Sequence, residues 1–479
     1  MDGPTEDQDG IAVLGAGIAG LVAAYELEAL GHRVTVLEGS ERIGGRIHTH
    51  RFGTADDAPH AELGAMRIPA THELTMRYVH KLGLASALRP FPTILSDDHN
   101  RLDTGSGFVR VKDAAKALVA DLRREVDTGA YKPETVLFGA WLAAVVRAIS
   151  PAELRDNLAA DLAALLPLAD RLDLTPYLHG PRSERIDLGA VFREHPELRA
   201  GCTPRLYVFL DDLLLETGTS LMYLSGGMSR LVERLADRIR GPILPGREVV
   251  GLHAGDDAVR VTLRHGTHRP THRHPAALCT LPFSVLRKIP LDGVDADKRD
   301  VINTMEYGSA TKIALLCREA FWERAGIRGG ASATGGRTRQ TYYPPREGAP
   351  RREAVLLGSY AIADDAHLLG KFPAEARHAA VVDELAPLHP ELKEPGMVLD
   401  AASIAWADNP WSNGCTAIRW RWGSDADGSD EEMRRAARPQ GRLFFAGEHC
   451  STTPAWINGA IESALGAVAA IDTALRRSW

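Results

Sequence analysis

The chain begins with an apolar strand, a glycine turn and a helix. Residues 11–14 form a short apolar run, and the positions after it have the spacing of a helix that ends near Leu30. Gly31 follows, and residues 34–37 form a second apolar run. A strand, a helix and a second strand in this order predict the beginning of a βαβ unit. We therefore expect an α/β fold at the N-terminus.

The pattern changes to long amphipathic segments between about residues 107 and 222. Ala114, Leu118 and Leu122 recur at helical spacing. Residues 150–153, Ser-Pro-Ala-Glu, have the sequence of a capping box with proline in the first helical turn. This region is predicted to be a helical insertion.

Short apolar runs return after the insertion, including residues 259–263 and 276–281, and the C-terminal stretch has the order strand, glycine turn, helix. The first fold is therefore expected to resume there. Residues 328–339 and 424–431 are rich in glycine, serine and charge, which predicts surface loops.

The composition is that of an ordinary globular chain. Of its 479 residues, 44% are apolar and 25% are charged, and this length suits two or three domains or one interleaved unit. Lys and Arg number 56 against 63 Asp and Glu, which gives a net charge of −7 without a long basic block. This balance argues against nucleic acid as a partner.

The start of the chain, its apolar runs and its cysteines indicate the cellular compartment of the protein. The acidic start lacks the order of an export signal, and charge interrupts every apolar run before it reaches the length of a membrane span. The cysteines are odd in number and form no CxxC pair, and no histidines have metal-ligand spacing, so we expect neither disulfides nor a metal. A cytoplasmic protein without a membrane segment is predicted. The cysteines are Cys202, Cys279, Cys317, Cys415 and Cys450.

A glycine motif follows the first strand and begins the helix. Gly15 allows a tight turn, Gly17 lets the backbone approach a pyrophosphate, and Gly20 allows the helix to pack closely on the strand. Glu38 ends the second strand, where a carboxylate can accept hydrogen bonds from a ribose diol. A dinucleotide with an unphosphorylated ribose is predicted, but this motif alone does not separate NAD from FAD.

A second glycine pair extends this signal. Residues 44–46, Gly-Gly-Arg, resemble the FAD signature of the flavin amine oxidase family, in which the motif and the Rossmann unit together hold the pyrophosphate. The resemblance implies that Arg46 pairs with a phosphate. It continues through residues 62–69, 310–313, 444–448 and 455–463, and it leaves out only the helical insertion.

The resemblance also implies the architecture. We expect a Rossmann-type FAD-binding domain interleaved with an α+β substrate domain of mixed sheet, together with the helical insertion. The expected ranges are 1–59, 223–304 and 438–479 for the FAD domain, 60–106 and 305–437 for the substrate domain, and 107–222 for the insertion.

The family pattern implies a set of contacts to FAD. The helix that follows Trp456 is expected to direct its N-terminus at the pyrimidine edge of the flavin, and Val249 is expected near the adenine. The expected cofactor contacts are Gly15, Gly17, Gly20, Glu38, Gly45, Arg46, Met66, Arg67, Val249, Cys415, Gly447, Glu448, Trp456 and Ile457.

Within the family, the chain is most similar to L-amino acid oxidases. Arg67 and Tyr360 match the arginine and tyrosine that grip the substrate carboxylate in those enzymes. Simple monoamine oxidases lack this arginine and hold the amine between two aromatic rings, whereas the matching positions here are Thr416 and Trp456. Lys312 matches the family lysine that holds a water near flavin N5. The expected catalytic set is Lys312, Arg67, Tyr360 and Trp456.

Two positions carry open alternatives. Cys415 matches the residue that monoamine oxidases link covalently to the flavin, so it either tethers FAD or lines its dimethylbenzene edge without reacting. Residues 416–422 alternate in polarity, so Trp420 either lines the substrate cavity or belongs to an apolar strand face.

We therefore expect an FAD-dependent L-amino acid oxidase that passes a hydride from the substrate Cα to flavin N5. The imino acid would hydrolyse to a keto acid and ammonia, and O2 would leave as hydrogen peroxide. The nearest alternative is a biosynthetic amine or amide oxidase acting on a substrate without a carboxylate. A flavin-binding module without turnover is a third. The resemblance also implies a homodimer.

Overall fold

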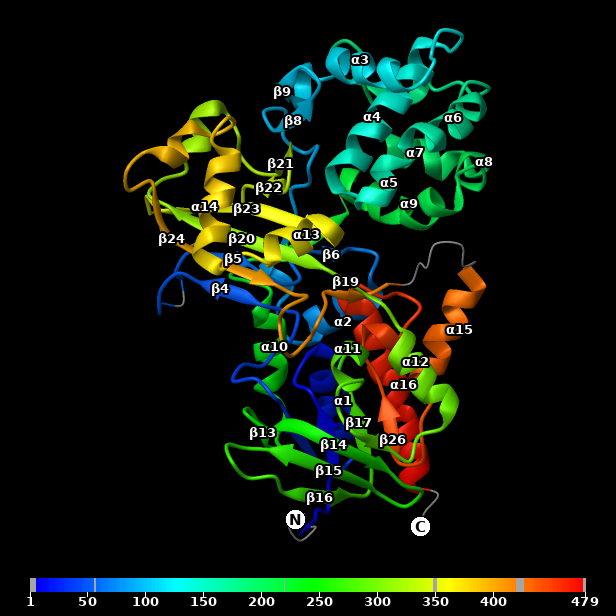
Figure 1. Ribbon diagram of the computed structural model, residues 1–479, viewed down its shortest axis with the longest axis vertical. Helices are drawn as coiled ribbons and strands as arrows, with labels where there is room; N and C mark the ends of the chain where they lie inside the picture. Colours follow the sequence, from blue (N-terminus) through cyan, green and yellow to red (C-terminus); the bar gives the residue numbers. More distant parts are fainter. Residues whose placement is uncertain (1–5, 56, 219, 348–350, 419–425, 477–479) are drawn as a thin grey trace.

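The computed structural model describes five stretches of the chain (Figure 1). Trp420, whose place in a strand was predicted, lies outside them. The described residues are 6–55, 57–218, 220–347, 351–418 and 426–476.

The predicted βαβ unit is confirmed. Strands β2 (Ile11–Leu14) and β3 (Val34–Leu37) pair in parallel, and helix α1 (Ile18–Ala29) joins them. Their sheet has five parallel strands in the order β13-β3-β2-β17-β26, which is completed by β13 (Ile243–Leu244), β17 (Ala277–Cys279) and β26 (Leu443–Phe445).

Segments far apart in the sequence complete this domain. Helix α16 (Ile457–Arg476) packs beside α1, so the two ends of the chain share one core (Figure 1). The other face is covered by a sheet whose long strands are β14 (Glu248–Ala254), β15 (Val259–Arg264) and β16 (Thr271–His274).

A mixed seven-stranded sheet forms the second layer, in the order β24-β20-β23-β22-β21-β8-β9. Side chains alternate across it. In β23, Ala354 and Leu356 join the core under helices α13 and α14, whereas Val355 and Leu357 join the core of the helical region. The strands are β8 (Arg101–Thr104), β9 (Gly107–Arg110), β20 (Ala310–Cys317), β21 (Ala331–Gly335), β22 (Arg339–Tyr342), β23 (Ala354–Ile362) and β24 (Val398–Ala405), and the helices are α13 (Ala363–Gly370) and α14 (Ala374–Leu385).

The predicted helical region is present between Ala115 and Thr217 and lies beside the seven-stranded sheet (Figure 1). The predicted capping box is wrong, because the Ser150 hydroxyl donates to the Val146 carbonyl of the preceding helix. The helices are α3 (Ala115–Glu125), α4 (Pro133–Ile149), α5 (Ala152–Asp156), α6 (Leu158–Ala169), α7 (Leu188–Glu194), α8 (Pro196–Ala200) and α9 (Pro204–Thr217).

Two predicted loops are wrong. The stretch 328–339 contains β21 and the first residue of β22, because pairing with neighbouring strands outweighs its polar composition. The stretch 424–431 runs into helix α15 (Ala426–Ala437), which packs on α12 (Ala296–Thr304).

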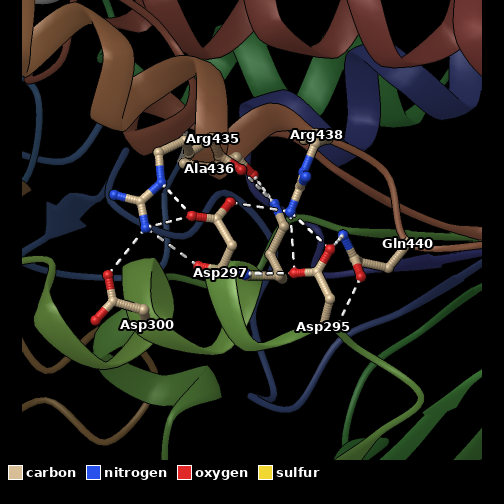
Figure 2. Close-up of polar contacts among 8 residues, drawn as sticks. Asp295, Asp297, Asp300, Arg435, Ala436, Arg438 and Gln440 are labelled. Atoms are coloured by element: carbon tan, nitrogen blue, oxygen red, sulfur yellow. Dashed lines mark hydrogen bonds and ion pairs between the residues drawn. The ribbon is translucent and has the colours of Figure 1, made fainter.

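Ion pairs join α12 and α15 (Figure 2). Arg435 donates to Asp297 at 2.7 Å and to Asp300 at 2.9 Å, and Arg438 donates to Asp295 at 2.7 Å. Below them the buried Lys298 ammonium donates to the last carbonyls of α15, those of residues 435 and 436, at 2.7 Å each. These contacts fix α15 just before β26 and the residues that follow it.

Short elements connect the layers. Among the described helices, none is long and apolar enough to cross a membrane. The remaining strands are β1 (Glu6–Asp7), β4 (Thr49–Arg51), β5 (His60–Glu62), β6 (Ile68–Pro69), β7 (Leu88–Pro90), β10 (Leu178–His179), β11 (Arg185–Ile186), β12 (Leu221–Leu224), β18 (Leu291–Asp292), β19 (Tyr307–Gly308) and β25 (Thr416–Ala417). The remaining helices are α2 (Glu73–Lys81), α10 (Ser229–Ala236) and α11 (Phe283–Leu286), with 3-10 turns at Ala85–Ala87, Val111–Asp113, Thr175–Tyr177, Phe321–Ala325, Pro390–Lys393 and Glu448–Cys450.

Candidate active site

An elongated cavity of about 480 Å³ lies along the parallel sheet. One end is lined by Glu38 and Val249, the middle by the glycine turn after β2, and the other end by Cys415 and Trp456. The cavity thus connects residues that are separated by most of the chain.

The three glycines of the motif differ in their surroundings. Gly15 has a φ of +105°, which favours glycine. Gly17 lines the cavity. A Cβ at Gly20 would lie 2.0 Å from the Gly15 carbonyl oxygen, so this glycine serves helix packing and does not line the cavity.

A carboxylate closes the first end of the cavity. Glu38 is buried at the end of β3, where it accepts hydrogen bonds from the Ala16 N–H at 2.7 Å and the Ser40 N–H at 2.9 Å. The Ala16 contact ties Glu38 to the glycine turn, so the carboxylate and the turn are held as one unit.

A buried ion pair holds the other end. Arg46 donates to Glu448 at 2.5 Å and to the Cys415 carbonyl at 2.9 Å. Glu448 also accepts from the Thr416 hydroxyl at 3.0 Å and from the Ala455 N–H at 3.1 Å. Burial opposes ionisation of Glu448, but Arg46 and these hydrogen bonds hold the pKa of its carboxyl below the ordinary value. The Glu448 carboxylate is thus charged and positions the segments that line the cavity.

The shape and donor groups of the cavity fit FAD. The N-termini of α1 and α16, at Ile18 and Ile457, both line it and supply partial positive charge. Gly45 has a φ of +56°, and a Cβ there would lie 3.3 Å from the Gly17 Cα, so only glycines leave this cradle open. An elongated ligand with phosphates in its middle suits this lining.

A charged cluster adjoins the Trp456 end, with Arg67 at its centre. The guanidinium forms an ion pair with Glu216 of α9, and it donates to the Tyr342 hydroxyl at 3.2 Å. It lies 5.8 Å from the Phe91 ring centre and 6.0 Å from that of Tyr360. The result is a buried cation set among aromatic rings.

Lys312 lies next to this cluster. Its ammonium is 4.6 Å from the Tyr360 ring centre, and it donates to the Gly64 carbonyl at 2.7 Å and the Glu62 carbonyl at 3.3 Å. Burial, followed by repulsion from Arg67, lowers the pKa of Lys312 to about 7. This amine therefore changes charge near neutral pH.

Helix α9 connects the cluster to the cofactor cavity. Asp212 lies one turn before Glu216 and accepts a hydrogen bond from Trp456, which itself lines the cavity. Burial raises the pKa of Asp212 to about 6 against the pull of Arg67. Trp456 also packs edge-on against the His72 ring, with centres 5.2 Å apart.

The predicted site residues divide into two groups. Gly20, Met66, Arg67, Lys312 and Tyr360 do not line the elongated cavity; Met66 instead faces a second cavity of about 310 Å³. The predicted residues that do line the elongated cavity are Gly15, Gly17, Glu38, Gly45, Arg46, Val249, Cys415, Gly447, Glu448, Trp456 and Ile457.

The sequence reasoning missed Asp212, Glu216 and Tyr342. A signal was present for the first two, since they are carboxylates spaced i, i+4 in a largely apolar helical stretch. No group of three or more His, Cys, Asp or Glu side chains within the described part of the chain is arranged to hold a metal ion.

Comparisons with known proteins show the family of the chain. The family model "Flavin containing amine oxidoreductase" matches residues 18–472. The flavin-dependent L-tryptophan oxidase RebO of Lentzea aerocolonigenes is 54% identical over 96% of this chain and 98% of that protein. The putative L-amino-acid oxidase YobN of Bacillus subtilis is 30% identical over 95% of this chain and 93% of that protein.

The fold likeness covers the whole chain as well. A putrescine oxidase bound to putrescine superposes with a TM-score of 0.66 at 18% identity, over 98% of this chain and all of that one. The family match runs from α1 into α16, and so it covers the charged cluster and the part of the cavity lining that follows the glycine turn. The chain therefore belongs to the flavin-containing amine oxidoreductase family.

Proposed function

We propose that the protein is an FAD-dependent L-amino acid oxidase whose substrates are aromatic L-amino acids of the L-tryptophan type. The observation that carries this proposal is the buried Arg67 among aromatic rings beside the cofactor cavity. A guanidinium in that position suits an α-carboxylate, and Phe91 and Tyr360 suit a planar side chain. The 54% identity to a protein named as an L-tryptophan oxidase supports the same substrate class.

In this proposal the chain acts mainly by positioning. Arg67 and Tyr360 bind the substrate carboxylate, and Trp456, which lines the cofactor cavity, forms a wall beside the substrate side chain. FAD, when bound, supplies the oxidising chemistry by accepting a hydride from Cα and passing electrons to O2. Lys312, held by two carbonyls, positions a water for the reaction with oxygen. The products are an imino acid, which hydrolyses to a keto acid and ammonia, and hydrogen peroxide.

The cofactor contacts expected from the sequence form part of the proposal. In this proposal Gly20 acts through helix packing, and Met66 acts from the second cavity, behind the charged cluster. The residues that line the elongated cavity contact FAD directly. We keep the interleaved ranges as the proposed domains: 1–59, 223–304 and 438–479 for FAD, 60–106 and 305–437 for substrate, and 107–222 for the helical insertion.

The proposed role of Cys415 is to line the cavity without a bond to FAD. A thioether would require the thiolate as nucleophile. Burial raises the pKa of the Cys415 thiol, although Arg46 and Lys312 oppose this rise. The test is the mass of the chain after acid denaturation. FAD wholly released from the chain supports a lining role, and a chain that keeps the mass of FAD overturns it.

Three further features are proposed from the family resemblance and the composition. The protein is a homodimer, its electron acceptor is O2, and its place is a reducing cytoplasm, in keeping with five free cysteines. Sedimentation of the holoenzyme at two concentrations tests the dimer, and a monomer at both would contradict it.

The decisive assay for the function compares amino acids with their amines. Peroxide production is measured for the purified protein with the proteinogenic L-amino acids and with the amines and acyl amines derived from them. We expect turnover with L-tryptophan and other aromatic L-amino acids. Turnover with amines or amides alone would instead establish the alternative, a biosynthetic oxidase of substrates without a carboxylate. If none of these compounds reduces the bound flavin, the remaining alternative is a flavin-binding module without turnover.

A further inference from the structure

Arg67 is already paired in the structure, although a substrate carboxylate would need it. Its guanidinium contacts the Glu216 carboxylate, whose side chain is only 4% exposed. Glu216 also accepts a hydrogen bond from the Tyr342 hydroxyl at 3.5 Å. Helix α9 thus places a carboxylate of the protein where an amino acid would place its own.

The charged and titratable groups around Glu216 come from three strands, from the residue before β6 and from its own helix. Arg67 precedes β6, Tyr342 belongs to β22, Lys312 to β20 and Tyr360 to β23. On α9 itself, Asp212 repels Glu216. Among these groups Arg67 forms the direct ion pair, so it is the main cation that keeps Glu216 ionised in this buried position.

A substrate that takes Arg67 leaves two carboxylates, Glu216 and Asp212, one helical turn apart without that cation. Two buried carboxylates in such a place require a new cation or a proton. An amino acid brings the cation with it, because its ammonium and its carboxylate are attached to the same carbon. The Arg67–Glu216 pair therefore has the two charges that a zwitterion needs as partners.

We propose that Glu216 exchanges Arg67 for the substrate ammonium and then removes one proton from it. The substrate carboxylate pairs with Arg67 in the same exchange. One N–H bond of the ammonium breaks and one O–H bond forms on Glu216, which leaves a neutral amine and a neutral carboxylic acid. No redox change occurs in this step. The inference rests on the proposed oxidase function, and it names Glu216 as the general base of that reaction.

The exchange makes the base depend on the substrate carboxylate. Burial raises the pKa of Glu216, and Arg67 lowers it again while the two are paired. Once a substrate carboxylate neutralises Arg67, Glu216 holds a proton more firmly and accepts it from the ammonium. An amine without a carboxylate does not displace Glu216 and finds no base. When product leaves, Arg67 and Glu216 pair again and the proton is released.

The first test uses a carboxylate that has no ammonium. Indole-3-propionate is titrated into the holoenzyme by calorimetry, with the wild-type chain and with Glu216→Gln. We expect about tenfold tighter binding to the variant, because Arg67 no longer has an internal competitor. Unchanged or weaker binding would overturn the exchange. Asp211→Asn is the matched control, an exposed carboxylate of the same helix paired with Arg199, and its affinity should equal that of the wild type.

The second test needs no variant and covers the case in which Glu216→Gln does not fold. Binding of indole-3-propionate to the wild-type holoenzyme is measured near neutral pH in buffers of different ionisation enthalpy. Displaced from Arg67, Glu216 should take up a proton, so close to one proton per site is expected to be absorbed. Binding without proton uptake would overturn the proposal. Uptake that persists in both Asp212→Asn and Lys312→Met assigns the proton to Glu216, and its loss in either variant would assign it elsewhere.

The third test measures the rate of flavin reduction, the step that needs the base. Reduction of the bound flavin by L-tryptophan is followed without oxygen across pH. Glu216→Gln should slow it by about 100-fold or more, and Glu216→Asp should restore part of the rate. Wild-type rates and an unchanged pH profile in Glu216→Gln would overturn the proposal. If the wild-type chain itself is not reduced, the proposed oxidase function fails, whereas proton uptake on binding still reports the exchange.

Discussion

At the scale of single residues, we propose that Arg67 determines the choice of substrate. It is a buried cation with aromatic neighbours, and its only ion-pair partner within the described residues is Glu216 of the same chain. Arg67→Ala should raise KM for L-tryptophan by roughly 30-fold or more, because a buried charge-assisted contact of about 2 kcal/mol or more is lost.

The control for this variant is its flavin content. Arg67 does not line the cofactor cavity, so the purified variant should retain as much FAD as the wild type. Steady-state kinetics with an unchanged KM would remove Arg67 from the substrate site. Loss of FAD would show instead that Arg67 supports the cofactor.

Lys312 should give the reaction with oxygen its pH dependence. Its pKa of about 7 means that the amine is mostly charged below that pH and mostly neutral above it. A cation favours the negative charge that develops on oxygen, so reoxidation should slow as pH rises through about 7. Lys312→Met should slow reoxidation and abolish this dependence. Stopped-flow mixing of the reduced enzyme with O2 measures it, and a pH dependence retained in the variant would contradict the assignment.

At the scale of elements, the contacts between α12 and α15 should differ sharply in their importance (Figure 2). Lys298 is fully buried, donates to two carbonyls at the end of α15 and lies 4.2 Å from the Phe445 ring centre. Lys298→Met removes the ammonium from both carbonyls, leaves the Arg435 carbonyl only a long contact of 3.4 Å with the Arg438 N–H, and should cost about 2–4 kcal/mol. Arg438→Ala removes half-exposed ion pairs and should cost less than about 1 kcal/mol.

Urea unfolding of the two variants, followed by tryptophan fluorescence, measures this difference. Equal losses of stability in Lys298→Met and Arg438→Ala would show that the surface pairs, and not the buried ammonium, attach α15. The comparison has a functional side, since α15 leads directly into β26 and the cavity residue Glu448.

Elements were predictable where the decisive interactions are local. The strand, glycine turn and helix of residues 11–37 follow from short-range patterns, and the structure reproduces both strands to the residue. Strand β21 was missed because pairing with distant β8 and β22 stabilises a stretch whose own composition favours a loop. The start of α15 was missed because contacts at the other end of the helix, where Arg435 pairs with Asp297 of α12, hold it in place and lie outside the polar stretch.

At the scale of the whole molecule, the site joins parts that the sequence separates. The cofactor cavity could be predicted because its glycines and carboxylates occur in recognisable motifs. The Arg67–Glu216 pair could not be predicted from the sequence. The two residues lie far apart in the chain and meet only when α9 packs over the charged cluster. Glu216 belongs to the insertion, which was also the part outside the family resemblance.

The central claim is that the substrate must carry a carboxylate, and anaerobic reduction of the bound flavin tests it most directly. The wild-type holoenzyme is mixed without oxygen with L-tryptophan and, separately, with tryptamine, which differs only in lacking the carboxylate. We predict that L-tryptophan bleaches the flavin rapidly and that tryptamine does so at least about 100-fold more slowly. Equal bleaching by both compounds, or bleaching by tryptamine alone, would contradict it.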